Sequence, residues 1–259
     1  MMPDKRSMTQ TVATGKAPSV ALRLRSFFVL SCIFATSIVS YRLVCNYLSL
    51  GHGAAIAAAG LLLFIFALVI IGLRHHCFER FGFANTVTAI RAAIVCMIAA
   101  LVFFPSTPEG IESVPWILVG LVILVLAMDG LDGYLARRFE YQSDLGARFD
   151  MEVDALLVLC LAAAAFLLGK GEAWVLLIGL MRYAFVLAQY PLPRLRAHLP
   201  SSLRRKLVCV VQVAVLCLVV VPGVLPPASS WLLAISLLLL CYSFAIDCLY
   251  LFMPVEASE

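Results

Sequence analysis

Eight apolar stretches of bilayer-spanning length occupy most of this chain. A transmembrane helix needs roughly 20 mostly apolar residues. The stretches lie at 27–49, 53–73, 86–104, 116–136, 152–169, 173–190, 207–225 and 230–252. Only 13% of the residues are charged, about half the share found in soluble domains. The sequence therefore predicts an all-α polytopic membrane protein with about eight transmembrane helices, and it excludes a soluble enzyme.

Polar segments flank these stretches. Residues 1–26 carry scattered Lys and Arg without a signal-peptide pattern, and we expect a disordered cytoplasmic tail there. Residues 74–84 mix basic and aromatic side chains, which is typical of a segment lying at a membrane surface. Residues 254–259 form a second short tail.

The distribution of Lys and Arg predicts the orientation. With the N-terminus in the cytoplasm, 16 of the 19 Lys and Arg residues fall on the cytoplasmic side, whereas Lys170 lies outside and Arg42 and Arg182 lie within spans. An excess of Lys and Arg marks cytoplasmic loops. Tryptophans begin three spans at the outer face, as an interfacial belt would: Trp116, Trp174 and Trp231. We therefore expect an integral membrane protein whose polar chemistry faces the cytoplasm.

Four aspartates stand where the fourth and fifth stretches meet. Asp129 and Asp132 are three residues apart, and Asp150 and Asp154 are four apart, so each pair shares one face of a helix. Carboxylates at a membrane boundary are costly unless a positive group binds them. If the two helices form an antiparallel pair, the four acids converge at one depth, where a hard divalent cation such as Mg²⁺ would satisfy them.

Two other interpretations of the aspartates remain open at this point. The acids can form structural ion pairs with nearby arginines: Arg137, Arg138 and Arg148. Buried acids also mark the ion pathways of ion-coupled transporters. Transporters usually place such acids at mid-membrane on broken or repeated helices, and this chain shows no internal repeat.

The complete pattern around the acids is D-x-x-D-G-x-x-A-R-x8-G-x-x-x-D-x-x-x-D over residues 129–154. It resembles the signature of the CDP-alcohol phosphatidyltransferases, with all eight defining positions present and no insertion. The resemblance extends from residue 85 to about 250. It implies a six-helix membrane domain at 85–253, which would leave 27–73 as an accessory N-terminal hairpin.

The resemblance implies a metal-dependent enzyme of phospholipid biosynthesis in a bacterial inner membrane. The reaction is the transfer of a phosphatidyl group from CDP-diacylglycerol to an alcohol, with release of CMP. One or two Mg²⁺ or Mn²⁺ ions would be held by Asp129, Asp132, Asp150 and Asp154, with Asp154 also acting as the general base. Nucleotide-binding roles would fall to Asn85, Thr88, Gly133, Ala136, Arg137 and Gly146. Asn85 and Thr88, together with Arg91, would meet the nucleotide from the side opposite the acids.

Basic residues near the sixth and seventh stretches are candidates for binding the acceptor: Arg182, Arg204, Arg205 and Lys206. Lys206 and Gln212 match part of the G-K-x-K-T-x-x-Q stretch of glycerophosphate-type members. Val208 and Cys209 replace its second Lys and its Thr. That departure argues against glycerol 3-phosphate and leaves the acceptor alcohol open.

The resemblance leaves a second reaction open, in which a CDP-alcohol donates to diacylglycerol. An ion-coupled transporter is the alternative from another class. The expected partners are the nucleotide-lipid donor, the alcohol and membrane lipid, without nucleic acid. Members of the family are often dimers, so a homodimer is also expected.

Overall fold

A computed structural model describes residues 20–72, 83–104, 114–139, 144–192 and 202–252. Within these ranges the regular secondary structure is entirely helical. The α-helices are α1 (Val20–Tyr47), α2 (His52–Gly72), α3 (Phe83–Phe103), α4 (Val114–Phe139), α5 (Asp144–Leu167), α6 (Leu176–Ala188), α7 (Leu203–Val220) and α8 (Ala228–Phe252), with a 3-10 helix η2 (Ala173–Val175) before α6.

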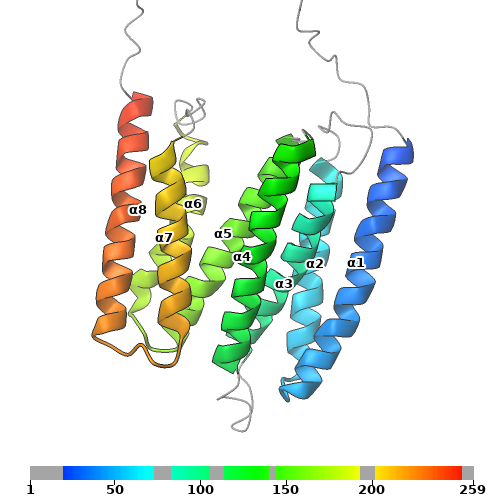
Figure 1. The fold of residues 1–259 in the computed structure, drawn as a ribbon, viewed down its shortest axis with the longest axis horizontal. Coiled ribbons are helices and arrows are strands. Elements are labelled where there is room, and N and C mark those ends of the chain that lie inside the picture. The colour runs from blue at the N-terminus through cyan, green and yellow to red at the C-terminus, as the bar shows by residue number, and fades with distance from the viewer. Residues whose placement is uncertain (1–19, 73–82, 105–113, 140–143, 193–201, 253–259) are drawn as a thin grey trace, which may run out of the picture.

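The helices run alternately up and down in one bundle (Figure 1). The start of α1 and the end of α8 lie at the same end, which is uppermost in Figure 1 and is called the upper end below. The upper end also holds the end of α4 and the start of α5. Each predicted stretch coincides with one helix, so the predicted all-α fold is confirmed.

Four helices are long and apolar enough to cross a membrane, by length and composition: Leu24–Tyr47, His52–Gly72, Asn85–Phe103 and Ala228–Phe252. Val114–Gly130 and Ala173–Ala188 are shorter apolar helices. Helices α5 and α7 carry several charged residues near their upper ends, and this explains why their composition is less apolar.

Several predicted boundaries need correction. Helix α1 begins at Val20, so the predicted tail at 1–26 overlaps the first helix by two turns. Helix α4 continues to Phe139 and α5 starts at Asp144, which makes the connection between them much shorter than predicted. The predicted surface segment 74–84 lies largely outside the described residues, as does the tail at 254–259.

Helix α3 is the central element, because it packs against α1, α2, α4 and α5. Its buried face is rich in alanine, including Ala89, Ala92 and Ala93, and α5 presents buried alanines at 162–165. Small side chains let two membrane helices approach closely. Helices α4 and α5 run antiparallel, as expected (Figure 1), but in the described residues α3 makes the extensive contacts with both of them.

The N-terminal hairpin α1–α2 packs on the side of α3 away from α6, α7 and α8 (Figure 1). The Tyr41 hydroxyl of α1 donates a hydrogen bond to the carbonyl of Ala93 in α3, over 2.6 Å. The hairpin also contributes buried residues such as Leu62 and Phe66 to the core that α3 completes. The hairpin is therefore packed directly against α3, the central helix of the bundle.

Candidate functional site

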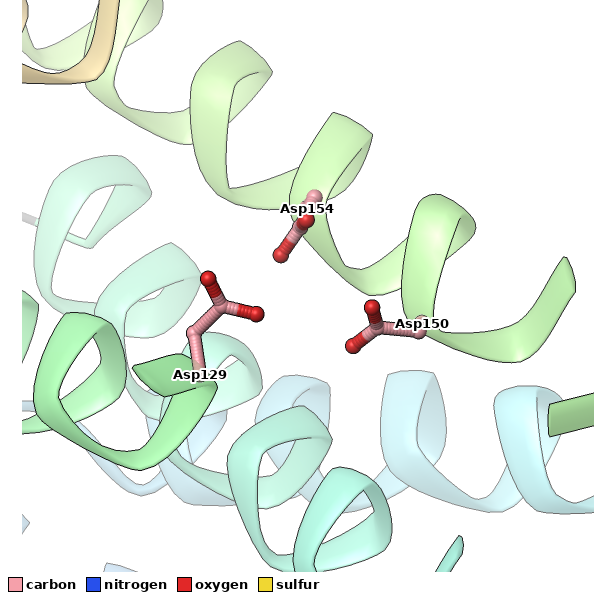
Figure 2. Close-up of side chains that lie close together, drawn as sticks. All are labelled: Asp129, Asp150 and Asp154. Carbon is pink, nitrogen blue, oxygen red and sulfur yellow. The ribbon is translucent and has the colours of Figure 1, made fainter. Parts of the chain in front are cut away.

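Three aspartates converge near the upper end of the bundle. Asp129 comes from α4, and Asp150 and Asp154 come from successive turns of α5. One carboxylate oxygen of each lies within 4.8 Å of those of the other two. Figure 2 shows the three carboxylates pointing toward one another. The predicted convergence is confirmed for these three, whereas the side chain of Asp132 lies outside the described residues.

The cation beside these acids is Arg91 of α3. Its guanidinium lies 3.1 Å from Asp129, 2.5 Å from Asp150 and 2.5 Å from Asp154. The Arg91 side chain is only 1% exposed, whereas the three carboxylates are between one third and one half exposed. Arg91 therefore holds the acids from inside the bundle and leaves their outer side open.

This contact differs from what the sequence suggested for Arg91. We placed it, with Asn85 and Thr88, on the side of the nucleotide opposite the acids. Close packing of α3 on α5 brings the guanidinium directly onto the carboxylates instead. The structural alternative named other arginines, but Arg148 is exposed and pairs with none of the three acids in the described ion pairs.

The charge of the cluster favours a further cation. Three carboxylates and one guanidinium leave a net charge of −2 when all are ionised, which one divalent ion neutralises. Burial raises the pKa of the Asp150 carboxyl, which precedes the predicted span, and the Arg91 guanidinium opposes this rise. Three oxygen ligands around one point are the donor set that Mg²⁺ and Mn²⁺ prefer, so these residues fit such an ion.

The residues predicted to bind the nucleotide belong to α3, α4 and α5, the same three helices that carry Arg91 and the acids. Asn85 and Thr88 are buried on the first two turns of α3, and Gly146 lies in the first turn of α5. The other three lie in the last turns of α4, but their side chains are outside the described residues: Gly133, Ala136 and Arg137.

The candidate acceptor residues lie on α6 and α7, next to α5. Arg182 of α6 pairs with Glu152 of α5, over 2.6 Å. Arg204 and Arg205 lie 2.5 and 3.6 Å from Asp247 of α8. These two arginines belong to the first turn of α7 rather than to a loop, and the Lys206 side chain lies outside the described residues.

Asp247 and Glu152 are residues whose partners the sequence did not predict. Asp247 pairs with Arg204 and Arg205 across the α7–α8 contact. The signal was present, because an isolated acid in an apolar helix needs a cation at the same depth. Only the packing of α7 against α8 shows which cation it is.

A cavity of about 380 Å³ connects the acid cluster to these basic residues. Its lining includes Asp154, Arg182, Arg205, Gln212 and Asp247. Gln212 donates a hydrogen bond to the carbonyl of Ser236, while its buried Oε1 has no partner in the described residues. The cavity is therefore lined by both positively and negatively charged side chains, and Asp154 links it to the acid cluster.

Close packing of α6 on α5 forms one wall of this cavity. Gly179 lines it, and a Cβ at Gly179 would lie 2.5 Å from the Cα of Leu159. Only glycine fits at such a distance. Arg182 follows three residues later on the same helical face, so this contact positions Arg182 over Glu152.

A family model described as CDP-alcohol phosphatidyltransferase matches residues 81–242, which is more than half of the chain. The match begins after the N-terminal hairpin and includes the three aspartates, Arg91 and most of the cavity lining. No curated protein and no solved structure matches the chain.

Proposed function

Because the chain belongs to the CDP-alcohol phosphatidyltransferase family, we propose that it transfers a phosphatidyl group from CDP-diacylglycerol to an alcohol and releases CMP. Family membership makes it a transferase and disfavours the ion-coupled transporter. The single observation that carries the proposal is the convergence of Asp129, Asp150 and Asp154, which belong to a complete eight-position motif. The identities of the donor and of the acceptor are the part of this statement that is a proposal.

In this proposal the aspartates hold one or two Mg²⁺ or Mn²⁺ ions, with Asp132 as a fourth ligand. A bound divalent ion supplies charge neutralisation for the diphosphate of the donor. The oxygen of the acceptor hydroxyl attacks the phosphorus attached to diacylglycerol, and Asp154 accepts the proton of that hydroxyl. The bond from that phosphorus to the CMP oxygen breaks, and CMP leaves.

Nucleotide binding is assigned to residues near the upper end of α3, α4 and α5: Asn85, Thr88, Gly133, Ala136, Arg137 and Gly146. Glycine and alanine leave room for the cytidine nucleotide beside the helix, and Arg137 is expected to pair with its phosphates. The buried positions of Thr88 and Asn85, about one and two turns before Arg91, support contact from the α3 side.

The cavity beside Asp154 is the proposed acceptor site. An alcohol placed there has its hydroxyl beside the proposed base, while Arg182, Arg205 and Gln212 surround the rest of the molecule. Each of these two arginines already has a carboxylate partner. An acceptor phosphate must therefore compete with Glu152 and Asp247, and this competition selects acceptors that carry a strong negative charge.

The direct test is the release of CMP from CDP-diacylglycerol by the purified protein with Mg²⁺ or Mn²⁺ and a panel of phosphorylated and neutral alcohols. Release that depends on one alcohol class supports the proposal and names the acceptor class. Turnover of a CDP-alcohol with diacylglycerol, without turnover of CDP-diacylglycerol, would instead establish the alternative reaction of the same family.

Replacing Arg205 with Gln is expected to raise the KM for a phosphorylated acceptor about 10- to 150-fold, because a charge-assisted hydrogen bond contributes about 1.5–3 kcal/mol. The KM for CDP-diacylglycerol should stay unchanged, since Arg205 lies on the acceptor side of Asp154. Steady-state kinetics with each substrate varied in turn measures both values.

The matched control for this variant is Arg148→Gln, which removes an exposed arginine from α5 and should change neither KM. An unchanged acceptor KM in Arg205→Gln would contradict binding of an acceptor phosphate by this residue. It would point to a neutral alcohol.

Replacing Arg91 with Gln is expected to make the folded protein depend on divalent ions. Without the guanidinium the three carboxylates repel one another. Breaking a buried pair costs about 3–5 kcal/mol, and partial exposure of the acids reduces this to about 2 kcal/mol. In chelator we expect the Tm to fall by roughly 4–8 °C, and Mg²⁺ should raise it more than in the wild type.

The control for Arg91 is Lys170→Met. Lys170 is also a buried cation, but it lies in the turn after α5 and donates a hydrogen bond to the Val224 carbonyl. Its loss should lower the Tm without changing the increment caused by Mg²⁺. If Mg²⁺ raises the Tm of Arg91→Gln and of the wild type by the same amount, Arg91 and the ion do not interact with the same carboxylates.

We also propose the membrane in which the protein lies and its orientation there, neither of which the apolar helices specify by themselves. The excess of Lys and Arg places the upper end, with the acids, in the cytoplasm of a bacterial inner membrane. Single cysteines introduced at 194–206 should then react with an impermeant thiol reagent only after the inner membrane is opened. Labelling from the periplasm in intact cells would overturn this orientation.

A further inference from the structure

An apolar groove of about 450 Å³ lies between α1 and α3, on the hairpin side of the central helix. One wall is a face of α1 from Cys32 to Val44, and the other is a face of α3 from Ile90 to Met97. Leu121 of α4 closes part of it. The groove depends on the N-terminal hairpin, which precedes the part of the chain that the family model matches.

The polar side chains in this groove are already satisfied. The hydroxyl groups of Thr36, Ser37 and Ser40 donate to backbone carbonyls one turn earlier in α1, over 2.9, 2.7 and 3.1 Å. The Tyr41 hydroxyl donates to Ala93. Every hydroxyl donor that lines the groove is therefore used, and the surface left for an occupant is hydrocarbon. An apolar chain fits such a wall better than a polar headgroup.

The groove lies below the acid cluster, along two of the helices that carry it. Ile90 precedes Arg91 in α3 on a different face of that helix, and Leu121 lies about two turns before Asp129 in α4. The groove's α1 wall covers the 13 residues from Cys32 to Val44, a rise of roughly 18 Å at 1.5 Å per residue, and its α3 wall from Ile90 to Met97 rises roughly 10 Å. One leaflet of a bilayer core is about 15 Å thick, so the groove has the length of one acyl chain whose headgroup lies at the cluster.

We propose that one acyl chain of the lipid donor lies in this groove, so that the N-terminal hairpin forms part of the donor site. The inference rests on the proposed function for the identity of the donor. Hydrocarbon gains little by moving from lipid to an apolar protein wall. The effect of the groove is therefore to orient the donor, because a chain held along α3 places its diphosphate against the acids.

This arrangement separates the two substrates. The donor chain lies on the α1 side of α3, and the cavity proposed for the acceptor lies on the α5–α8 side of the cluster. The acids stand between them. The diacylglycerol oxygen is neither the nucleophile nor the leaving group of an in-line displacement, so its chain can lie in the groove, off the axis that joins the acceptor hydroxyl to CMP.

The first test maps the chain directly on the wild-type protein. CDP-diacylglycerol with a diazirine at the end of one acyl chain is photo-cross-linked in mixed micelles, and labelled peptides are identified by mass spectrometry. We expect labels in α1 between 32 and 44 and in α3 between 90 and 97. Phosphatidylcholine with the same diazirine chain is the control and should label this region much less.

The second test fills the groove. Thr36→Trp places an indole at a groove-lining position, and Ala35→Trp places the same group on the adjacent exposed position of α1, outside the groove. Thr36→Trp should lower kcat/KM about tenfold for a long-chain donor, because a misplaced reacting group slows turnover. It should leave a dihexanoyl donor unaffected, whereas Ala35→Trp should affect neither.

Labels concentrated in other helices, or equal labelling by phosphatidylcholine, would overturn the groove assignment. Equal loss of activity with long-chain and dihexanoyl donors in Thr36→Trp would overturn it as well. Absence of CMP release by the wild type with either donor would overturn the proposed function alone. The label map would still decide the groove in that case, because it does not need turnover.

Discussion

With all divalent cations chelated, the protein is expected to release no CMP from CDP-diacylglycerol, and Mg²⁺ or Mn²⁺ should restore the activity. The physical reason is the net charge of −2 that Asp129, Asp150, Asp154 and Arg91 share. A diphosphate brought to such a cluster meets like charge unless a cation lies between them. The measurement is CMP release in chelator and after titration with each metal.

Single replacements of the ligands should have the same effect as chelation. Asp129→Ala, Asp132→Ala and Asp150→Ala are each expected to abolish turnover and to weaken nucleotide binding. The matched control is Glu152→Gln, which removes a carboxylate from the same helix α5 that faces Arg182 instead of the cluster. This control should keep its dependence on the metal. Full activity of the wild type in chelator would eliminate the metal from the proposal.

Replacing Asp154 with Asn is expected to separate binding from chemistry. The amide keeps the shape of the side chain but cannot accept the hydroxyl proton, and this transfer typically contributes about 10²–10⁴-fold to the rate. Asp154 is the acid that lines both the cluster and the acceptor cavity, which is why the role of base is assigned to it. Turnover should collapse while metal-dependent binding of CDP-diacylglycerol survives at least in part.

The comparison with Asp150→Asn makes this result specific. Asp150 belongs to the cluster but does not line the cavity, so its amide should weaken metal-dependent donor binding as well as turnover. Binding is measured by equilibrium titration with a fluorescent CDP-diacylglycerol, and turnover by CMP release. Near-normal turnover of Asp154→Asn would remove Asp154 as the base.

Two spaces of different chemistry lie on either side of α3 near the acid cluster, and the one on the α5–α8 side is lined in part by Asp154. The cavity on the α5–α8 side holds polar groups of both charges, and the groove on the α1 side is lined by hydrocarbon. A water-soluble alcohol is polar and the acyl chains of a lipid are hydrocarbon, so the two substrates differ as these two linings do. The proposed division of substrates therefore follows the chemistry of the two linings.

The sequence by itself determined the helices and the acids. A chain in lipid must satisfy its backbone hydrogen bonds internally, so eight apolar stretches had to become helices, and each one did. The spacing of Asp150 and Asp154 placed them on one face of α5 because the helical repeat is local. These properties depend on neighbours in the chain, and a sequence displays such neighbours directly.

Only the tertiary structure decided which residues from different helices meet. Arg91 lies 59 residues from Asp150 and Arg204 lies 43 residues from Asp247. Their pairing depends on how closely alanine-rich α3 packs on α5 and how α7 packs on α8. A shift of one residue in either packing turns a side chain by about 100° around its helix, so the partner of a buried charge is set by helix packing and not by local sequence.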